Sequence, residues 1–139
     1  MLRRAFILAG GCLAVTLSGC SLGATSASTS GFTGQAALVA ATLNTLASDS
    51  SSANGADICK NVLAAPVLAK INKLGSCATI IDNQLKTVDD FTLKITTIKV
   101  KNSTATARVQ TVHLGKKVIQ TVALTHEPAG WRISSVSVV

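Results

Sequence analysis

The sequence predicts an α+β domain in which N-terminal helices pack on one face of a four-stranded antiparallel meander, with one disulfide. Three observations predict it. Apolar residues recur at helical spacing through the first part of the chain, up to about Asp89. From Phe91 onwards, apolar and polar residues alternate and turn-forming residues interrupt them. Two cysteines, Cys59 and Cys77, lie in the helical part. Helices followed by a run of strands are typical of α+β folds.

The first nineteen residues predict an export signal. Arg3 and Arg4 give it a positive start, residues 5–17 form an apolar run, and two small residues follow. These three parts in this order are typical of a signal peptide. We therefore expect residues 1–19 to be removed. General secretory export is the expected route, and the arginine pair leaves twin-arginine export open.

The end of this segment resembles the lipobox of bacterial lipoproteins. Leu17, Ser18 and Gly19 precede Cys20, as a leucine and two small residues precede the obligatory cysteine of that motif. The resemblance implies that a diacylglyceryl group joins the Cys20 thiol and that the signal is cut just before it. Two acyl chains hold a protein durably, because each buried CH₂ contributes about 0.8 kcal/mol. We expect a lipid-anchored protein at the outer face of the cell membrane. The alternative is an ordinary secretory signal in which Cys20 stays a free thiol.

Residues 20–33 predict a flexible tether between that anchor and a folded domain. The segment is rich in Ser, Thr, Gly and Ala, and such a composition buries too little apolar surface to fold alone. Residues 34–139 remain for a single domain. A domain of this size forms a core but benefits from a covalent cross-link.

Four helical segments are predicted in the first half of the domain. The Ser-rich stretch at residues 48–55 is expected to be a loop. Pro66 suits a first helical turn, Gly75 suits a helix end, and Ser76 suits an N-cap. The expected helices are residues 35–47, residues 57–64, a segment from Pro66 to Gly75, and one that follows Ser76.

Four strands are predicted in the second half. The alternation slips near Thr97 and Ile98, which indicates a β-bulge. Turn-forming residues at 101–103, 115–116 and 127–130 separate the strands. The expected strands are a first one from Phe91 to about Val100, then residues 104–114, 117–126 and 131–138.

A disulfide between Cys59 and Cys77 is expected, because no other cysteine remains in the domain once Cys12 leaves with the signal and Cys20 carries lipid. The cell envelope is oxidising and allows such a bridge to persist. Closing a loop of this length stabilises a fold by about 3 kcal/mol. A redox pair is the alternative, although redox cysteines are usually two residues apart.

The chain also resembles a known superfamily. The resemblance rests on the lipobox and tether, on residues 57–59, 66 and 76–78, and on the closing sequence Gly-Trp-Arg-Ile at 130–133. These features resemble small actinobacterial lipoproteins of the nuclear-transport-factor-two-like superfamily. Its other members include proteins like limonene-epoxide hydrolase, ketosteroid isomerase and polyketide cyclase. The resemblance implies a curved sheet wrapped around helices, which forms a cone with an apolar pocket. Members use such pockets for catalysis, for binding or for protein docking, so the fold leaves the function open.

An acidic pair, Asp89 and Asp90, precedes the first strand. Enzymes of the superfamily use a pocket Asp as a base, and the resemblance extends that role to this pair. Adjacent residues on a strand point to opposite faces, so at most one of them enters a pocket, and Asp90 is the candidate. The alternative is a solvated turn before the strand.

The two histidines, His113 and His126, are candidate general bases or metal ligands. With Glu127 they contain the residue types of a two-His, one-carboxylate site, although their spacing equally suits solvent-facing strand ends. Trp131 either packs in the core or stacks on a ligand. The chain has no Tyr to serve as the oxyanion donor of isomerase chemistry. No phosphate loop, nucleophile elbow or zinc-ligand spacing appears, so no cofactor or metal is predicted.

The net charge is +7. Removal of Arg3 and Arg4 leaves eleven cations against six acids, a charge of +5. Nucleic-acid binding needs aromatic residues interleaved with the cations. These are missing, so no nucleic-acid partner is predicted, and an anionic lipid or cell-wall polymer fits better. The cations of the strand half, which form either a basic face or a plain solvated one, are Lys94, Lys99, Lys101, Arg108, Lys116, Lys117 and Arg132.

Three functions remain open. The first is a non-enzymatic, membrane-anchored module that binds an apolar small molecule, a lipid or another envelope protein. The second is a pocket enzyme of isomerase, hydrolase or dehydratase type that uses His113, His126, Asp89 or Asp90. The third is a structural lipoprotein whose protein partner docks on the sheet.

Overall fold

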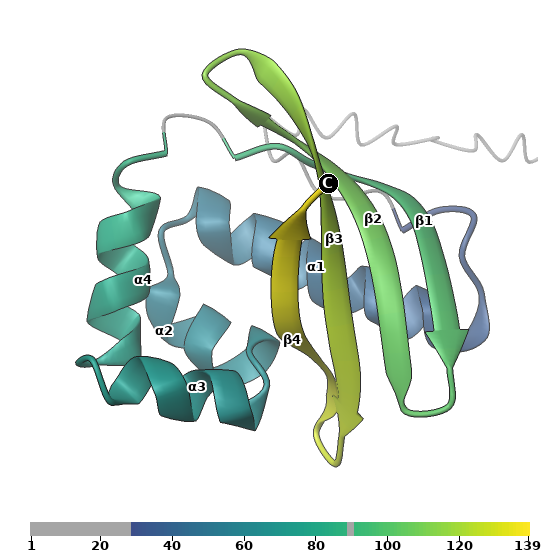
Figure 1. Ribbon diagram of the computed structural model, residues 1–139, viewed down its shortest axis with the longest axis horizontal. Coiled ribbons are helices and arrows are strands. Elements are labelled where there is room, and N and C mark those ends of the chain that lie inside the picture. The colour runs from purple at the N-terminus through teal and green to yellow at the C-terminus, as the bar shows by residue number, and fades with distance from the viewer. Residues whose placement is uncertain (1–28, 89–90) are drawn as a thin grey trace, which may run out of the picture.

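The computed structural model describes residues 29–88 and 91–139 and confirms the predicted fold class (Figure 1). The helices are α1 (Gly34–Ser51), α2 (Gly55–Asp57), the π-helix η1 (Ile58–Val62), α3 (Ala65–Asn72) and α4 (Cys77–Leu85). The strands are β1 (Leu93–Lys101), β2 (Thr104–His113), β3 (Lys116–Glu127) and β4 (Gly130–Val138). They form an open antiparallel meander in the order β1-β2-β3-β4.

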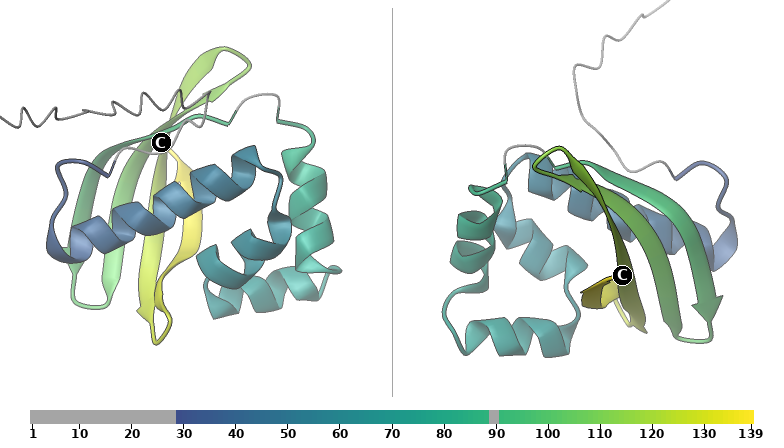
Figure 2. Two further views of the ribbon diagram at one scale, coloured as in Figure 1. Left: turned by 180° about the vertical axis from the view of Figure 1, so that it is seen from behind. Right: turned by 45° about the horizontal axis from the view of Figure 1, so that its top comes forward.

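The helices cover the sheet unevenly. Helix α1 lies across one face of the sheet, here called the inner face, whereas α2, η1, α3 and α4 stand beside β4 (Figures 1 and 2). The sheet curves around α1 (Figure 2). Because α1 crosses the strands at an angle, part of the inner face lies beyond its reach.

The hydrophobic core lies between α1 and the inner face. Alternate strand residues point inward because side chains change face at each step of a strand. Burial of side chains of this size supplies the main stabilising free energy of such a domain, about 1.5–3 kcal/mol for each large one. The largest fully buried side chains are Leu43, Leu124, Val39, Val62, Val109 and Val122.

Short contacts attach the helices to the edge of β4. Leu63 forms a parallel bridge with Ile133, and the Ala64 N–H donates to the Ile133 carbonyl at 2.9 Å. The next residue, Ala65, donates its N–H to Glu127 Oε1, also at 2.9 Å. The first two contacts pair part of the β4 edge, which otherwise has unsatisfied backbone groups. The third binds α3 to the last residue of β3.

The helical half differs from the prediction at two places. The expected loop at 48–55 is wrong in its first half, because α1 continues to Ser51 and buries Ser50. Tertiary packing there outweighs the low helix propensity of serine, and the Ser51 hydroxyl bonds back to the Ser48 carbonyl at 2.8 Å. The expected α-helix 57–64 is instead a short α-turn followed by η1, and Ala64 is already the N-cap of α3.

The strand half differs in the placement of its irregularities. The first bulge lies between Ile95 and Thr97, slightly before the expected position. A second register shift opposite Ala123 and Leu124 was not expected. Leu114, assigned to a strand by its hydropathy, is in the turn, where it and Gly115 both have positive φ. Two central residues with positive φ are typical of a two-residue hairpin, and that geometry decides where β2 ends.

The predicted disulfide is confirmed. Cys59 in η1 and Cys77, the first residue of α4, are joined and buried. The bridge fastens α4 to η1. Ser76 is the N-cap of α4 as expected, but its side chain makes no capping bond. The Cys77 N–H is instead bound by Asn72 Oδ1 at 3.2 Å.

Replacing both cysteines, Cys59→Ser with Cys77→Ser, is expected to lower the free energy of unfolding by about 3 kcal/mol, because the unfolded chain regains the entropy of an open loop. Urea unfolding with and without reductant measures this. Reductant is expected to destabilise the wild type by a similar amount and to leave the double variant unchanged. A wild type that is equally stable with its thiols reduced would contradict a stabilising role.

Candidate functional site

The candidate site is an apolar groove on the part of the inner face that α1 leaves uncovered. It lies between the sheet and the α1, η1 and α4 helices, and it consists of two cavities. The first has a volume of about 260 Å³. Its polar liners are all neutral: Ser50, Gln84, Thr111 and Gln120. Its apolar liners are Leu46, Ile58, Leu63, Ile81, Leu85, Phe91, Leu93, Val109, Val122, Ile133 and Val136.

The second cavity adjoins the first along the strands and has a volume of about 350 Å³. The two share Phe91, Thr111 and Gln120. On β3 the liners pass from Val122 through Gln120 to Val118, so the cavities follow each other along the sheet. Their sizes are at the lower end of those typical of ligand sites, and together they form one elongated groove.

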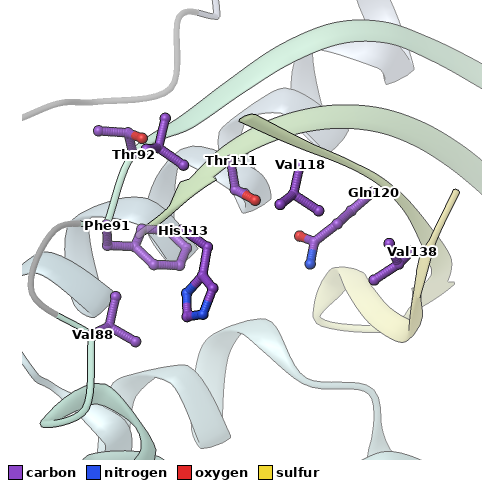
Figure 3. Close-up of a pocket in the computed structure, with 9 residues that line it drawn as sticks. Val88, Phe91, Thr92, Thr111, His113, Val118, Gln120 and Val138 are labelled. Carbon is purple, nitrogen blue, oxygen red and sulfur yellow. The ribbon is translucent and has the colours of Figure 1, made fainter. Parts of the chain in front are cut away.

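Polar groups are concentrated in the second cavity. Its wall includes Thr92, Thr111, His113 and Gln120, and in Figure 3 the His113 imidazole and the Gln120 amide face the same space as Phe91. Thr92 Oγ1 is buried and has no hydrogen-bond partner in the structure. An unpartnered buried hydroxyl costs free energy. The oxygen itself is covered by its neighbours, so the polar groups that the cavity presents are those of the other liners. The groove is therefore apolar at its inner end and polar at its outer end.

The structure separates the two histidines. His113 is at the end of β2 and lines the second cavity. His126 donates its backbone N–H to the Ser103 carbonyl, which precedes the other end of β2. Ten residues of strand at about 3.3 Å each place them roughly 30 Å apart. The conceivable site of two histidines and Glu127 is therefore wrong. Among the described residues, no three His, Cys, Asp or Glu side chains gather closely enough to hold a metal ion.

Trp131 lies in the core rather than in the groove. It is buried, and its Nε1 donates to Gln35 Oε1 at 2.9 Å. The His126 ring meets it edge-on, with the ring centroids 5.1 Å apart. An open hollow of about 290 Å³ borders these three residues, but the indole is buried and its N–H is already bound to Gln35.

Several predicted site residues lie outside the described part of the chain. They are the lipid-attachment candidate Cys20 and the acidic pair Asp89 and Asp90. The residues that flank the pair, Val88 and Phe91, both line the second cavity. Among the described residues, none of the helices combines the length and hydropathy needed to span a membrane.

The cations of the strand half are on the face opposite the groove, with one exception. The exception is Lys116, which pairs with His113 at the hairpin tip and therefore lies on the same face of the sheet as that groove residue. Within the four strands, all of which the structure describes, the one acidic residue is Glu127, and it is bound to α3. The outer face is thus basic, with hydroxyl side chains between the cations. The cations that alternate with inward residues are Lys94, Lys99, Lys101, Arg108, Lys117 and Arg132.

Comparison with known protein families, curated proteins and solved structures found no match for this chain. The superfamily resemblance therefore remains an expectation.

The sequence analysis did not identify the residue near the end of β4 that lines the groove, Val136. Strict alternation from Trp131 and Ile133 places Ser135 inward, but the extra residue in β4 at the second bulge brings Val136 inward instead. A signal was present in the sequence. Two successive serines, Ser134 and Ser135, break the alternation of β4, as two successive threonines break that of β1.

A second polar irregularity lies away from the groove opening, in the last turn of α1. Burial raises the pKa of Asp49, and the Asp57 carboxylate raises it further. Asp49 Oδ2 is buried and has no hydrogen-bond partner in the structure. A carboxylate near a helix C-terminus also meets the negative end of the helix dipole. The ionised form of Asp49 is therefore disfavoured in the folded state.

Asp49→Asn is expected to raise the free energy of unfolding at pH 7, because the native state no longer holds this carboxylate. The raised native pKa means that the folded wild type binds the proton more tightly than the unfolded chain. Its stability therefore falls as pH rises from about the ordinary value of 3.8 through the native pKa. Urea unfolding at pH 7 and pH 3 measures the effect, and the gain is expected to vanish at pH 3. A loss of stability at pH 7 would contradict it.

Proposed function

We propose that this chain is a membrane-anchored envelope lipoprotein that binds an elongated apolar ligand, such as an acyl chain, in the groove without reacting with it. The observation that carries the proposal is the lining of the first cavity. All its described liners are apolar or uncharged polar side chains, and they leave an open space between α4 and the inner face. A wall without acid or base suits binding better than proton transfer.

The size and shape of the groove favour a chain-like ligand. Each buried methylene contributes about 0.8 kcal/mol, so ten of them supply about 8 kcal/mol before the cost of lost motion is subtracted. The elongated groove accommodates such a chain along β2 and β3. The polar outer end, with the Gln120 amide, suits the head of an amphiphile.

The disulfide supports the envelope part of the proposal. Cys59 and Cys77 are bonded, and such bonds persist in oxidising compartments outside the cytoplasm. A lipid on Cys20 and a short tether up to the described domain would then hold the domain near the bilayer, which is a source of acyl ligands.

One observation favours the enzyme alternative. His113 is the ionisable side chain among the described liners of the second cavity, and histidine is a common general acid or base in catalysis. One variant distinguishes the binding function from the enzyme function. His113→Ala abolishes turnover in a pocket enzyme and leaves ligand capture intact in a binding module.

A residue that fills the groove is expected to displace the ligand. Val136→Trp adds a large ring to the wall, whereas Ser135→Trp adds the same ring to the adjacent residue, which faces away from the groove. Native mass spectrometry of the full chain purified from its own membranes measures the bound mass. We expect Val136→Trp to lose a discrete mass that the wild type and Ser135→Trp retain. Wild-type spectra that show acylated protein alone would sink the ligand proposal and favour protein docking.

Cys20→Ala is expected to abolish lipid labelling and to shift the protein from the membrane to the soluble fraction. Cys12→Ala is the matched control, because it lies in the segment that the signal peptidase would remove. Unchanged membrane association of Cys20→Ala would overturn the lipoprotein part of the proposal and leave the groove argument standing.

A further inference from the structure

The outer opening of the groove is surrounded by exposed apolar side chains. Among the described residues, seven large hydrophobic side chains are exposed, and five of them belong to this end of the domain. Val88, Val136 and Val138 line the two cavities. Leu114 follows the liner His113 in the sequence, and Val139 donates its N–H to the Ile119 carbonyl beside the opening. The five are Val88, Leu114, Val136, Val138 and Val139.

The β2–β3 hairpin protrudes from this end. The pairing of β1 with β2 starts at Thr111, and the pairing of β3 with β4 stops at Gln120. The residues between them continue as a two-stranded ribbon beyond the rest of the sheet (Figures 1 and 2). The tip of that ribbon is therefore the most prominent part of the groove opening.

Leu114 occupies a turn position at the hairpin tip that disfavours leucine. It is 83% exposed, and its φ of 50° is in the left-handed region, as is the 74° of Gly115. A hairpin turn of this kind favours Asn or Asp before the glycine, because a leucine there is strained. A large apolar side chain that is both strained and exposed indicates a contact outside the domain.

The charge around the tip points to the partner. Lys116 and Lys117 follow the turn directly and are exposed. No acidic residue lies between Thr104 and Thr125, a range that the structure describes in full. An apolar residue at the tip followed by two lysines matches a bilayer with anionic headgroups, in which the apolar side chain enters the acyl boundary and the lysines meet phosphates.

We propose that Leu114 inserts into an anionic bilayer while Lys116 and Lys117 contact its headgroups, so that the groove opens directly onto the membrane. The part that concerns ligand passage rests on the proposed function. The tether permits this orientation, because the eight residues between Cys20 and the described domain span up to about 28 Å when extended. The hairpin, rather than the tether, then decides which side of the domain faces the lipid.

Depth-dependent fluorescence quenching tests the contact. The full chain carrying Leu114→Trp is reconstituted in phosphatidylglycerol–phosphatidylcholine vesicles with brominated acyl chains. Leu74→Trp is the matched control, since Leu74 is 84% exposed and lies at the α3–α4 corner away from the hairpin (Figure 1). We expect strong quenching at position 114 and little at position 74, above the background of the buried Trp131. Equal quenching at both positions, or none, would overturn the proposal.

A second variant separates membrane contact from folding. Leu114→Asn places a favoured residue in the turn, so its melting temperature is expected to be equal to or above that of the wild type. The Leu114→Asn variant is expected to transfer ligand to anionic vesicles more slowly than the wild type and to carry the same amount of bound ligand. Lys116→Glu with Lys117→Glu is expected to weaken the contact about fivefold for each lysine lost, and to do so on anionic vesicles only.

The outcomes keep the two proposals distinct. Quenching at position 114 without any bound ligand would refute the groove function and retain membrane docking. Bound ligand without quenching would refute membrane docking and retain the groove function. Quenching that is equal on neutral and anionic vesicles would contradict the role of the lysines. Protection of Leu114 by a second protein in place of lipid would also overturn the membrane contact.

Discussion

The packing of α1 against the inner face of the sheet is the interaction on which the rest of the structure depends. It buries Val39, Leu43 and Ala47 against β1 to β4 and forms most of the core. A four-stranded sheet has more inner surface than one helix of this length covers, and here α1 crosses it at an angle (Figure 2). The uncovered part of that face is the groove. The same packing that stabilises the domain therefore leaves its candidate site open.

The groove stays open because α4 is held from the side. The disulfide joins α4 to η1, and η1 leads into the residues that pair with Ile133 at the edge of β4. Helix α4 packs mainly on α2, η1 and α3. A helix attached in this way stands opposite the inner face at a distance set by its neighbours. The cross-link thus positions one wall of the cavity as well as stabilising the fold.

The order of elements followed from the sequence because it depends on short-range patterns. Helical spacing before residue 86 and alternation after residue 92 decide which segments are helices and strands. The bulges are harder, since each depends on one extra residue, yet the paired threonines of β1 and the paired serines of β4 mark them. The end of β2 was misplaced because hydropathy assigns Leu114 to a strand, whereas turn geometry places it at a tip.

The candidate site was less accessible to sequence reasoning. The sequence placed His113 and His126 near the ends of neighbouring strands, and antiparallel register sends them to opposite ends of the sheet. The groove itself is made mostly of valines, leucines and isoleucines that are indistinguishable in the sequence from core residues. Only the packing geometry decides which of them face a void.

Asp49 and Leu114 each violate a local rule in this structure, and their surroundings distinguish them. Asp49 is an acid near a helix C-terminus with one buried, unpartnered oxygen. Leu114 is an apolar residue in a left-handed turn, with four further exposed valines and two lysines at the same end. A single irregularity costs stability and implies nothing more. At the groove opening, by contrast, several exposed apolar side chains lie together beside positive charges, as the proposed contact with a lipid bilayer requires. That shared position connects the hairpin to the groove behind it.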